Sequence, residues 1–115
     1  MRDRQRGRAA EDLAAAFLQQ QGLTLIERNY HCRFGEIDLI ARDGVTLVFV
    51  EVRMRSSNDF GGAAASITAG KRRKLTRAAR HYLAGRTRAP ACRFDALLVS
   101  GPGHAVEWLK NAFGE

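Results

Sequence analysis

The feature that most constrains the fold is the dipeptide Asp43-Gly44, which lies between two runs of β-forming residues, 36–42 and 45–53. A type I′ turn needs positive φ at both central residues, and Asp-Gly is a preferred pair, so the segment predicts a two-residue β-hairpin. Residues 45–52 are nearly all apolar and β-branched or aromatic, as is typical of a central strand covered on both faces. The hairpin is therefore predicted to lie in the middle of a β-sheet.

Apolar residues at helical spacing predict a helix before and a helix after this hairpin. The first is expected over residues 6–21, ended by Gly22, and the second over residues 68–84. Further strands are expected at residues 23–30, 92–100 and 105–109, the last at a sheet edge, and a loop at residues 56–66. The order αβββαββ combines a hairpin with a crossover, which predicts an α/β fold with a mixed central sheet and a helix on each face.

Composition limits the class of protein. The 115 residues are 45% hydrophobic, which suits one core and a single domain over residues 1–115. We find no signal peptide and no membrane span, and Cys32 and Cys92 stand far apart without a zinc-ligand pattern, so we predict a cytoplasmic protein with no membrane partner. The net charge of +7 is carried mostly by arginine, which suits nucleic acid, although a well-solvated arginine-rich surface has the same charge.

Acidic residues meet on one face of the predicted hairpin. With a turn at Asp43-Gly44, Glu36 lies opposite Glu51, and Asp38 is a diagonal neighbour of Glu51 at about 7 Å. Carboxylates on a covered face are costly unless a cation neutralises them, and hard oxygen ligands favour Mg²⁺ or Mn²⁺. Asp38 and Glu51 are therefore predicted metal ligands, with Glu36 as an additional acid. The alternative is a set of surface ion pairs on an exposed hairpin.

Arg53 adds a positive charge on the same face, two residues beyond Glu51. A metal held by two carboxylates activates a water and polarises a phosphoryl oxygen, and a neighbouring cation stabilises the transition state. The combination predicts phosphodiester hydrolysis. Glu11, at the flank of the first helix's apolar stripe, could point at the same patch, although a first-turn glutamate commonly serves the helix dipole.

The second helix carries a dense set of cations. Those predicted to bind nucleic acid are Lys71, Arg73, Lys74 and Arg77. Like charges three and four residues apart repel each other, so a phosphate backbone would stabilise this face, whereas a solvated helix face is the alternative. The aromatic residues Tyr30, Phe34 and Phe60 could stack on unpaired bases, but such residues more often belong to the core. Gly61-Gly62 could form a flexible lip of the site.

Two runs make the sequence recognisable: Gly35-Glu36-Ile37-Asp38-Leu39-Ile40 and Phe49-Val50-Glu51-Val52-Arg53. Together they resemble the core motif of the PD-(D/E)XK nucleases. The chain also resembles, over nearly its whole length, the YraN-like family of small bacterial proteins, which is related to archaeal Holliday-junction resolvases. The residues that carry this second resemblance include Ala10-Glu11, Arg28-Asn29-Tyr30, Gly61-Gly62-Ala63, Lys71 and Arg93-Phe94-Asp95.

The resemblance implies a restriction-endonuclease-like fold in which Asp38 and Glu51 ligate the metal. Glu11 matches a helix acid of the resolvase-like members, Lys71 is singled out in the basic helix, and Arg53 stands at a position that is usually lysine. The implied activity is metal-dependent cleavage of nucleic acid, DNA more than RNA and branched DNA by analogy, with a homodimer as a plausible state. Because arginine keeps its proton at neutral pH, the alternative is a nucleic-acid-binding protein on a nuclease scaffold that cuts weakly or not at all.

Overall fold

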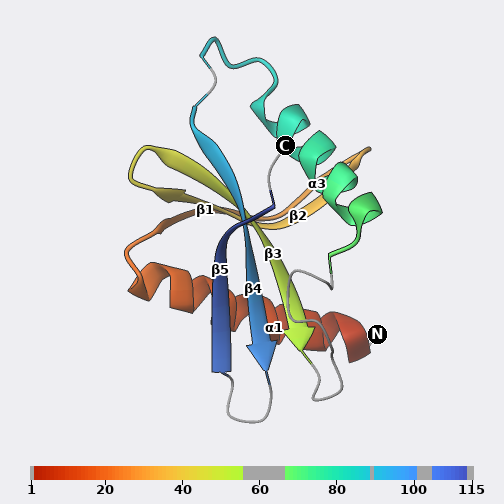
Figure 1. Ribbon diagram of the computed structural model, residues 1–115. Coiled ribbons are helices and arrows are strands. Elements are labelled where there is room, and N and C mark those ends of the chain that lie inside the picture. The colour runs from red at the N-terminus through yellow and green to blue at the C-terminus, as the bar shows by residue number, and fades with distance from the viewer. Residues whose placement is uncertain (1, 56–66, 89, 101–104, 114–115) are drawn as a thin grey trace.

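The computed structural model consists of two helices and five strands over the residues that it describes (Figure 1). These residues are 2–55, 67–88, 90–100 and 105–113. The elements are α1 Arg2–Gln20, β1 Thr24–Cys32, β2 Gly35–Asp43, β3 Thr46–Arg55, α3 Ala69–Leu83, β4 Cys92–Ser100 and β5 Ala105–Phe113. Their order, αβββαββ, is the predicted one. The expected loop over residues 56–66, with Phe60 and Gly61-Gly62, lies outside the described residues.

The sheet has the strand order β1-β2-β3-β4-β5, which places β3 at its centre as predicted. Neighbouring strands are antiparallel except β3 and β4, which run parallel and are connected through α3. A parallel pair needs such a crossover, so the mixed sheet follows from the chain order. The last strand lies at an edge, as expected, but continues to Phe113 rather than ending near residue 109.

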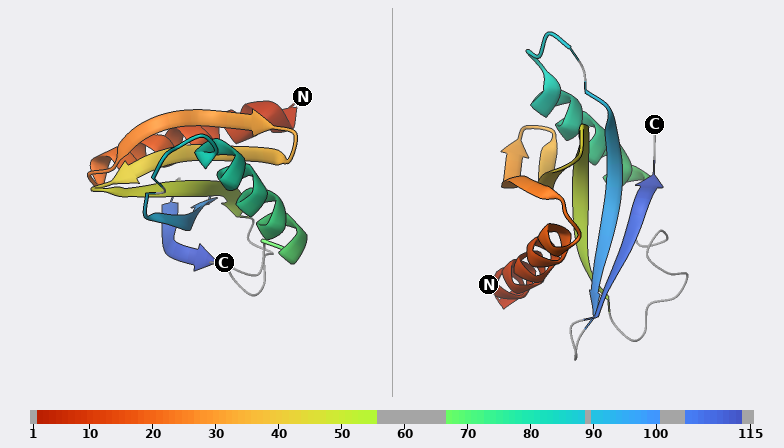
Figure 2. Two further views of the ribbon diagram at one scale, coloured as in Figure 1. Left: turned by 90° about the horizontal axis from the view of Figure 1, so that it is seen from above. Right: turned by 90° about the vertical axis from the view of Figure 1, so that its left-hand side faces the viewer.

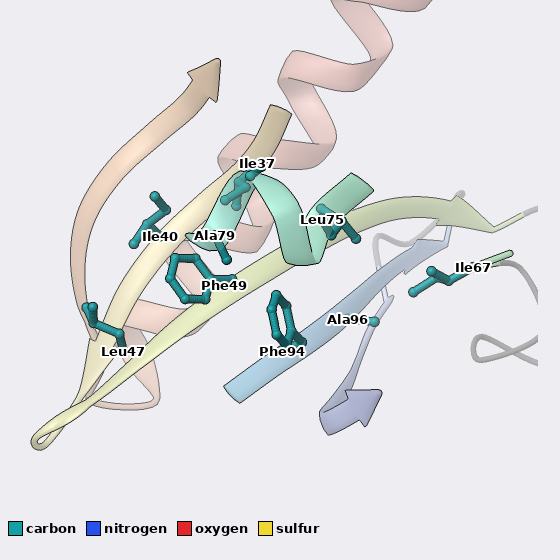
Figure 3. Packing of buried hydrophobic residues seen from close by; sticks show 10 residues of the cluster. Ile37, Ile40, Leu47, Phe49, Ile67, Leu75, Ala79, Phe94 and Ala96 are labelled. Atoms are coloured by element: carbon teal, nitrogen blue, oxygen red, sulfur yellow. The ribbon is translucent and has the colours of Figure 1, made fainter. Parts of the chain in front are cut away.

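The two helices cover opposite faces of the sheet (Figure 2, left). On the α3 side, Leu75, Ala78 and Ala79 pack against strand residues that include Phe49 and Phe94 (Figure 3). On the α1 side the buried residues are Ala14, Ala15, Leu18, Leu23, Leu39, Ala41, Val48, Val50 and Leu97. Alternate residues of β3 thus enter different layers, which explains why the whole strand is apolar.

The end of α1 is fixed by Gly22, the residue predicted to stop the helix. Its φ is 95°, and the N–H groups of Gly22 and Leu23 donate to the carbonyls of Gln19 and Leu18, each at 3.0 Å. This is the Schellman arrangement, in which glycine accepts the left-handed conformation without strain. It turns the chain so that Leu18 and Leu23 both enter the core.

The turn between β2 and β3 corrects one prediction. Asp43 pairs with Thr46, so the turn residues are Gly44 and Val45 rather than Asp43-Gly44. Only Gly44 of these has positive φ, at 63°. Asp43 stays in the strand, where its Oδ2 lies 3.0 Å from Nη1 of Arg93. This long-range ion pair favours the observed turn over the predicted one.

The corrected turn shifts the strand register by two residues. Ile40 pairs with Phe49 rather than with Leu47. Because side chains alternate along a strand, a shift of two keeps each residue of β3 on its predicted face. The shift moves Glu51 from a diagonal position to the position directly beside Asp38, one step beyond the last registered pair.

Asp95 anchors the far half of the sheet. Its side chain is fully buried and accepts hydrogen bonds from Nε of Arg93 at 3.0 and 3.2 Å, from Nε1 of Trp108 at 3.0 Å and from the N–H of Asn111 at 2.9 Å. These donors connect β4 to β5. A buried charge is tolerated only with such partners, so the network holds the edge strand in place.

Removal of this carboxylate is expected to destabilise the protein strongly. Asp95→Ala leaves Nε of Arg93 and the indole N–H of Trp108 without their acceptor, which should lower the free energy of unfolding by about 3 kcal/mol. Urea denaturation followed by fluorescence of the single tryptophan measures this change. The matched control is Asp12→Ala, which removes an exposed ion pair with Arg28 and should cost less than about 1 kcal/mol. Equal losses in the two variants would contradict the prediction.

Candidate functional site

The candidate site lies where the pairing of β2 with β3 stops. Leu39 and Val50 form the last registered pair, and the next residues along the two strands are Asp38 and Glu51. There the backbone N–H of Val52 donates to Oδ2 of Asp38 at 2.8 Å. A side-chain carboxylate thus takes the place of a strand carbonyl as acceptor, which fixes Asp38 against β3.

An irregularity in β2 accompanies this change. Ile37 and Ile40 both pack in the α3-side cluster, while Leu39 packs on the α1 side, so strict alternation fails between residues 37 and 39. The facing residue of β1, Asn29, has a φ of 55°. Our expectation that the acidic residues of this hairpin share one face assumed strict alternation along β2 and is wrong, because strict alternation does not survive this distortion.

The third predicted acid, Glu36, lies away from the pair. Its side chain is 56% exposed, and its Oε2 lies 3.1 Å from Nδ1 of His31 on the neighbouring strand. Its charge still adds slightly to the electrostatic environment of Asp38, where it raises the pKa. Glu36 is therefore an outer acid in this geometry rather than a member of the buried pair.

Glu51 is buried, with only 3% of its surface exposed, and two cations contact it. Nζ of Lys71 lies 3.2 Å from its Oε2, and Nη1 of Arg53 lies 3.8 Å from the same atom. Lys71 belongs to the first turn of α3, where its N–H is capped by the hydroxyl of Thr68 at 3.1 Å. The lysine that we predicted as a phosphate ligand is therefore the closer of the two cations to this carboxylate.

Asp38 carries the largest electrostatic perturbation of the site. Burial, followed by the neighbouring charge of Glu51, raises the pKa of Asp38 to about 7. The hydrogen bond from Val52 and the charge of Lys71 lower the pKa but do not offset the first two effects. The raised pKa means that ionising both carboxylates is unfavourable, so an additional positive charge beside the pair would be stabilising.

Glu11 approaches Asp38 from the α1 side. Burial and then the charge of Asp38 raise the pKa of Glu11, and contacts with Asn29 and Arg28 offset part of this effect. Its Oε1 lies 3.7 Å from Nη2 of Arg28. Within the described ranges, no three His, Cys, Asp or Glu side chains gather closely enough to hold a metal ion. Glu11 is thus a neighbour of the carboxylate pair and not a third member.

Asp38 and Glu51 are the groups that could hold a metal. Both offer hard oxygen atoms, and Mg²⁺ typically binds proteins through one or two carboxylates while keeping several waters. A carboxylate pair in which the pKa of Asp38 is raised is chemically suited to such an ion, because the cation favours the ionised form. Neither Cys32 nor Cys92 forms a disulfide, and neither belongs to this pair.

The raised pKa of Asp38 predicts a pH-dependent stability. Aspartate in an unfolded chain titrates near pH 4, so ionised Asp38 weakens the folded state as pH rises from about 4 through about 7. Asp38→Asn keeps an oxygen acceptor for Val52 without the charge. In EDTA its Tm should exceed that of the wild type by about 5 °C or more at pH 8, and the difference should shrink near pH 4.5. A Tm difference that is equal at both pH values would refute this.

The remaining predicted cations line the outer face of α3. Arg73, Lys74 and Arg77 are exposed, and the helix sequence from residue 69 to 83 contains no acidic residue. Among the predicted stacking residues, Tyr30 packs against the α3-side cluster, in agreement with the core alternative. Phe34 is half-buried and lies outside that cluster.

Sequence reasoning missed the contact between Lys71 and Glu51. The capping residue Thr68 marks the start of α3, and this signal places Lys71 in the first turn. No local pattern, however, says which strand the start of a helix will meet. The role of Val52 had no sequence signal at all, because the donor is a backbone N–H group.

None of the described helices is both long and apolar enough to cross a membrane.

Comparisons with known proteins give the family. The family described as "Uncharacterised protein family UPF0102" matches residues 10–99, which include Glu11, Asp38, Glu51 and Lys71. A UPF0102 protein of Nitrosomonas europaea is 65% identical over 111 residues, covering 96% of this chain and 94% of the relative. One of Psychromonas ingrahamii is 51% identical over 110 residues, covering 96% and 90%. The resemblance to the YraN-like family is thereby confirmed, and the chain belongs to the UPF0102 family.

Proposed function

We propose that this protein is a metal-dependent endonuclease that hydrolyses phosphodiester bonds of nucleic acid at Asp38 and Glu51. The observation that carries the proposal is the position of these two carboxylates, side by side where the β2–β3 ladder ends, with Glu51 buried and the pKa of Asp38 raised to about 7. An acid whose pKa is raised by burial and by a neighbouring carboxylate, as that of Asp38 is, is a candidate for function, because a structural role does not need this repulsion.

Asp38 and Glu51 would hold Mg²⁺ or Mn²⁺. When bound, such an ion lowers the pKa of a coordinated water and polarises a phosphoryl oxygen. The protein's own contribution is orientation: the N–H of Val52 holds one oxygen of Asp38, and Lys71 holds one oxygen of Glu51. Both carboxylates are thus fixed before substrate arrives, which reduces the cost of ordering them during the reaction.

Two cations could stabilise the extra negative charge of the transition state. Arg53 stands at the motif position that is usually lysine, and its guanidinium carries a fixed charge. Lys71 brings a compact ammonium group from α3 to the same carboxylate, 0.6 Å closer than Arg53 (3.2 against 3.8 Å). We assign Lys71 the role of the missing motif lysine, delivered from a helix instead of from β3.

The substrate class follows from the charges around the site. The exposed cations Arg73, Lys74 and Arg77 continue from Lys71 along α3, which suits contacts with successive phosphates. DNA, including branched DNA bound by a homodimer, is favoured by analogy with the resolvases that the family resembles, and fold analogy is a weaker guide to substrate than to chemistry.

A second candidate function is nucleic-acid binding without efficient cleavage. The observation in its favour is that Lys71 and Arg53 both contact Glu51, so this carboxylate already has counterions without a metal. A buried acid neutralised in this way can be purely structural. In that case Asp38 would remain protonated near neutral pH.

Cleavage of a labelled substrate panel tests the proposal. The panel contains duplex, single-stranded, flapped and four-way-junction DNA, with RNA versions of the first two, in Mg²⁺, Mn²⁺ or EDTA. We expect cleavage in either metal, none in EDTA, and cleavage at least about 10²-fold slower by Asp38→Asn. Binding without cleavage of any substrate, unchanged in Asp38→Asn, would support the second candidate instead.

A further inference from the structure

The turn between β1 and β2 carries an aromatic side chain, Phe34, that is only partly buried. Cys32 pairs with Gly35, so Arg33 and Phe34 are the turn residues. Such turns usually contain Gly, Asn or Asp. Phe34 is half-buried and is not among the residues that pack on the α3-side cluster, although Tyr30 of the preceding strand is.

The Phe34 ring is held in place by a short chain of contacts. Its centroid lies 5.8 Å from that of His81 on α3, with 62° between the rings. His81 is fixed in turn, because its Nδ1 lies 2.7 Å from the hydroxyl oxygen of Tyr30. The guanidinium carbon of Arg33 lies over the Phe34 ring, 4.9 Å from its centroid. The result is an aromatic ring held by its neighbours, with a planar cation over it, and groups that are already held in place lose little entropy when they bind a ligand.

Positive charge surrounds this surface. A Cβ on Gly35 would lie 3.5 Å from Cβ of Lys74, so Lys74 lies directly over the residue that follows Phe34. Arg77, one turn further along α3, is exposed, and so is Arg33. Aromatic side chains for bases combined with cations for phosphates are the usual means of binding single-stranded nucleic acid.

The aromatic surface and the carboxylate pair are connected by one stripe of α3. Lys71 contacts Glu51 at the start of the helix, Lys74 lies over Gly35, and His81 contacts Phe34. Ten residues separate Lys71 from His81, which corresponds to about 15 Å along a helix. A nucleic-acid single strand that follows this stripe would therefore place one base on Phe34 and, a few nucleotides away, a phosphate beside Lys71 at the carboxylate pair.

We propose that Phe34, with Arg33 and His81, forms a stacking site for an unpaired base, so that the substrate contains a single-stranded segment of DNA or RNA. This inference rests on the proposed function and makes its substrate class more specific. Bases inside an intact duplex are stacked on each other and cannot use the site. Duplex DNA would bind only through contacts between its phosphates and the exposed cations of α3.

Equilibrium binding in EDTA tests the stacking site without requiring cleavage. The probes are fluorescein-labelled DNA and RNA single strands of about 20 nucleotides and the corresponding DNA duplex, followed by anisotropy with the full chain. Phe34→Ala and Phe34→Leu should weaken single-strand binding about 10-fold while changing duplex binding less than about 2-fold. Phe34→Trp should bind as the wild type does. The matched control is Val45→Ala at the β2–β3 turn, where an apolar side chain is 86% exposed.

The outcomes separate this inference from the proposed function. A selective loss of single-strand binding that Phe34→Trp does not show supports the stacking site even if no cleavage is found. Whichever single strand the wild type binds more tightly, DNA or RNA, identifies the kind of nucleic acid that supplies the unpaired base. Single-strand binding by Phe34→Ala at the wild-type level, an equal loss on the duplex, or no single-strand binding by the wild type overturns it, whether or not the protein cuts.

Discussion

Asp38→Asn is expected to reduce single-turnover cleavage at saturating Mg²⁺ by about 10²- to 10³-fold. The substitution removes one of the two carboxylate charges proposed to hold the metal but keeps an oxygen that can accept the hydrogen bond from Val52. Because the same variant should be more stable than the wild type at pH 8, unfolding cannot explain the loss. The measurement is the cleavage rate with enzyme in excess, on the substrate that the panel identifies, alongside a thermal melt of the same preparation.

The control for this experiment is Asp12→Asn, which removes an acidic charge of α1 that pairs with Arg28 outside the carboxylate pair. It should cut within about threefold of the wild type. Cleavage by Asp38→Asn at that same level would show that the metal is held elsewhere or that cleavage comes from a contaminant, and the proposed active site would be wrong.

Lys71→Met is expected to lower kcat by about 10²-fold, with a smaller effect on KM. The ammonium group lies 3.2 Å from Glu51, so its removal takes away the closer of the two cations at the reacting centre. Adding Arg53→Lys to this variant should restore activity at least about 10-fold, because a lysine then stands at the position of the nuclease motif. Steady-state kinetics of the wild type, the single variant and the double variant measure both effects.

Lys110→Met is the matched control, since it removes the same group from β5, where Lys110 lies over the ring of Trp108. The opposite pattern is equally informative. A rise in KM alone after Lys71→Met, with a shallower salt dependence and no rescue by Arg53→Lys, would assign Lys71 to phosphate binding, as its place in the basic helix first indicated.

The order of elements and the central position of β3 could be read from the sequence, because each depends on local pattern. The apolar, β-branched run around Val48 and Val50 is typical of a strand covered on both faces, and Gly22 after an apolar helical stripe is typical of a helix end. The hairpin register could not be read in this way. A two-residue turn fits the sequence at Asp43-Gly44 or one residue later, and the contact that accompanies the observed choice, between Asp43 and Arg93, joins residues far apart in the chain.

The same distinction applies to the candidate site. Asp38 and Glu51 are neighbours in either register, since a shift by two preserves faces, so the predicted pair is insensitive to the error. The positive φ of Asn29 and the approach of Lys71 depend on how helices and strands dock, and no periodic pattern encodes them. The sequence suggests Phe34 as a stacking residue from its type alone, whereas the contacts with Arg33 and His81 that support the proposal are tertiary properties.

The parallel pairing of β3 with β4 has a kinetic consequence. The β2–β3 hairpin joins residues close in sequence and can form early, whereas β4 must wait for the α3 crossover to close a long loop. Asp38 and Glu51 lie on the early hairpin, while Lys71 lies on the crossover. We therefore expect Asp38 and Glu51 to come together during folding before Lys71 docks beside them. Until then the two carboxylates repel each other in water, where the repulsion is weak.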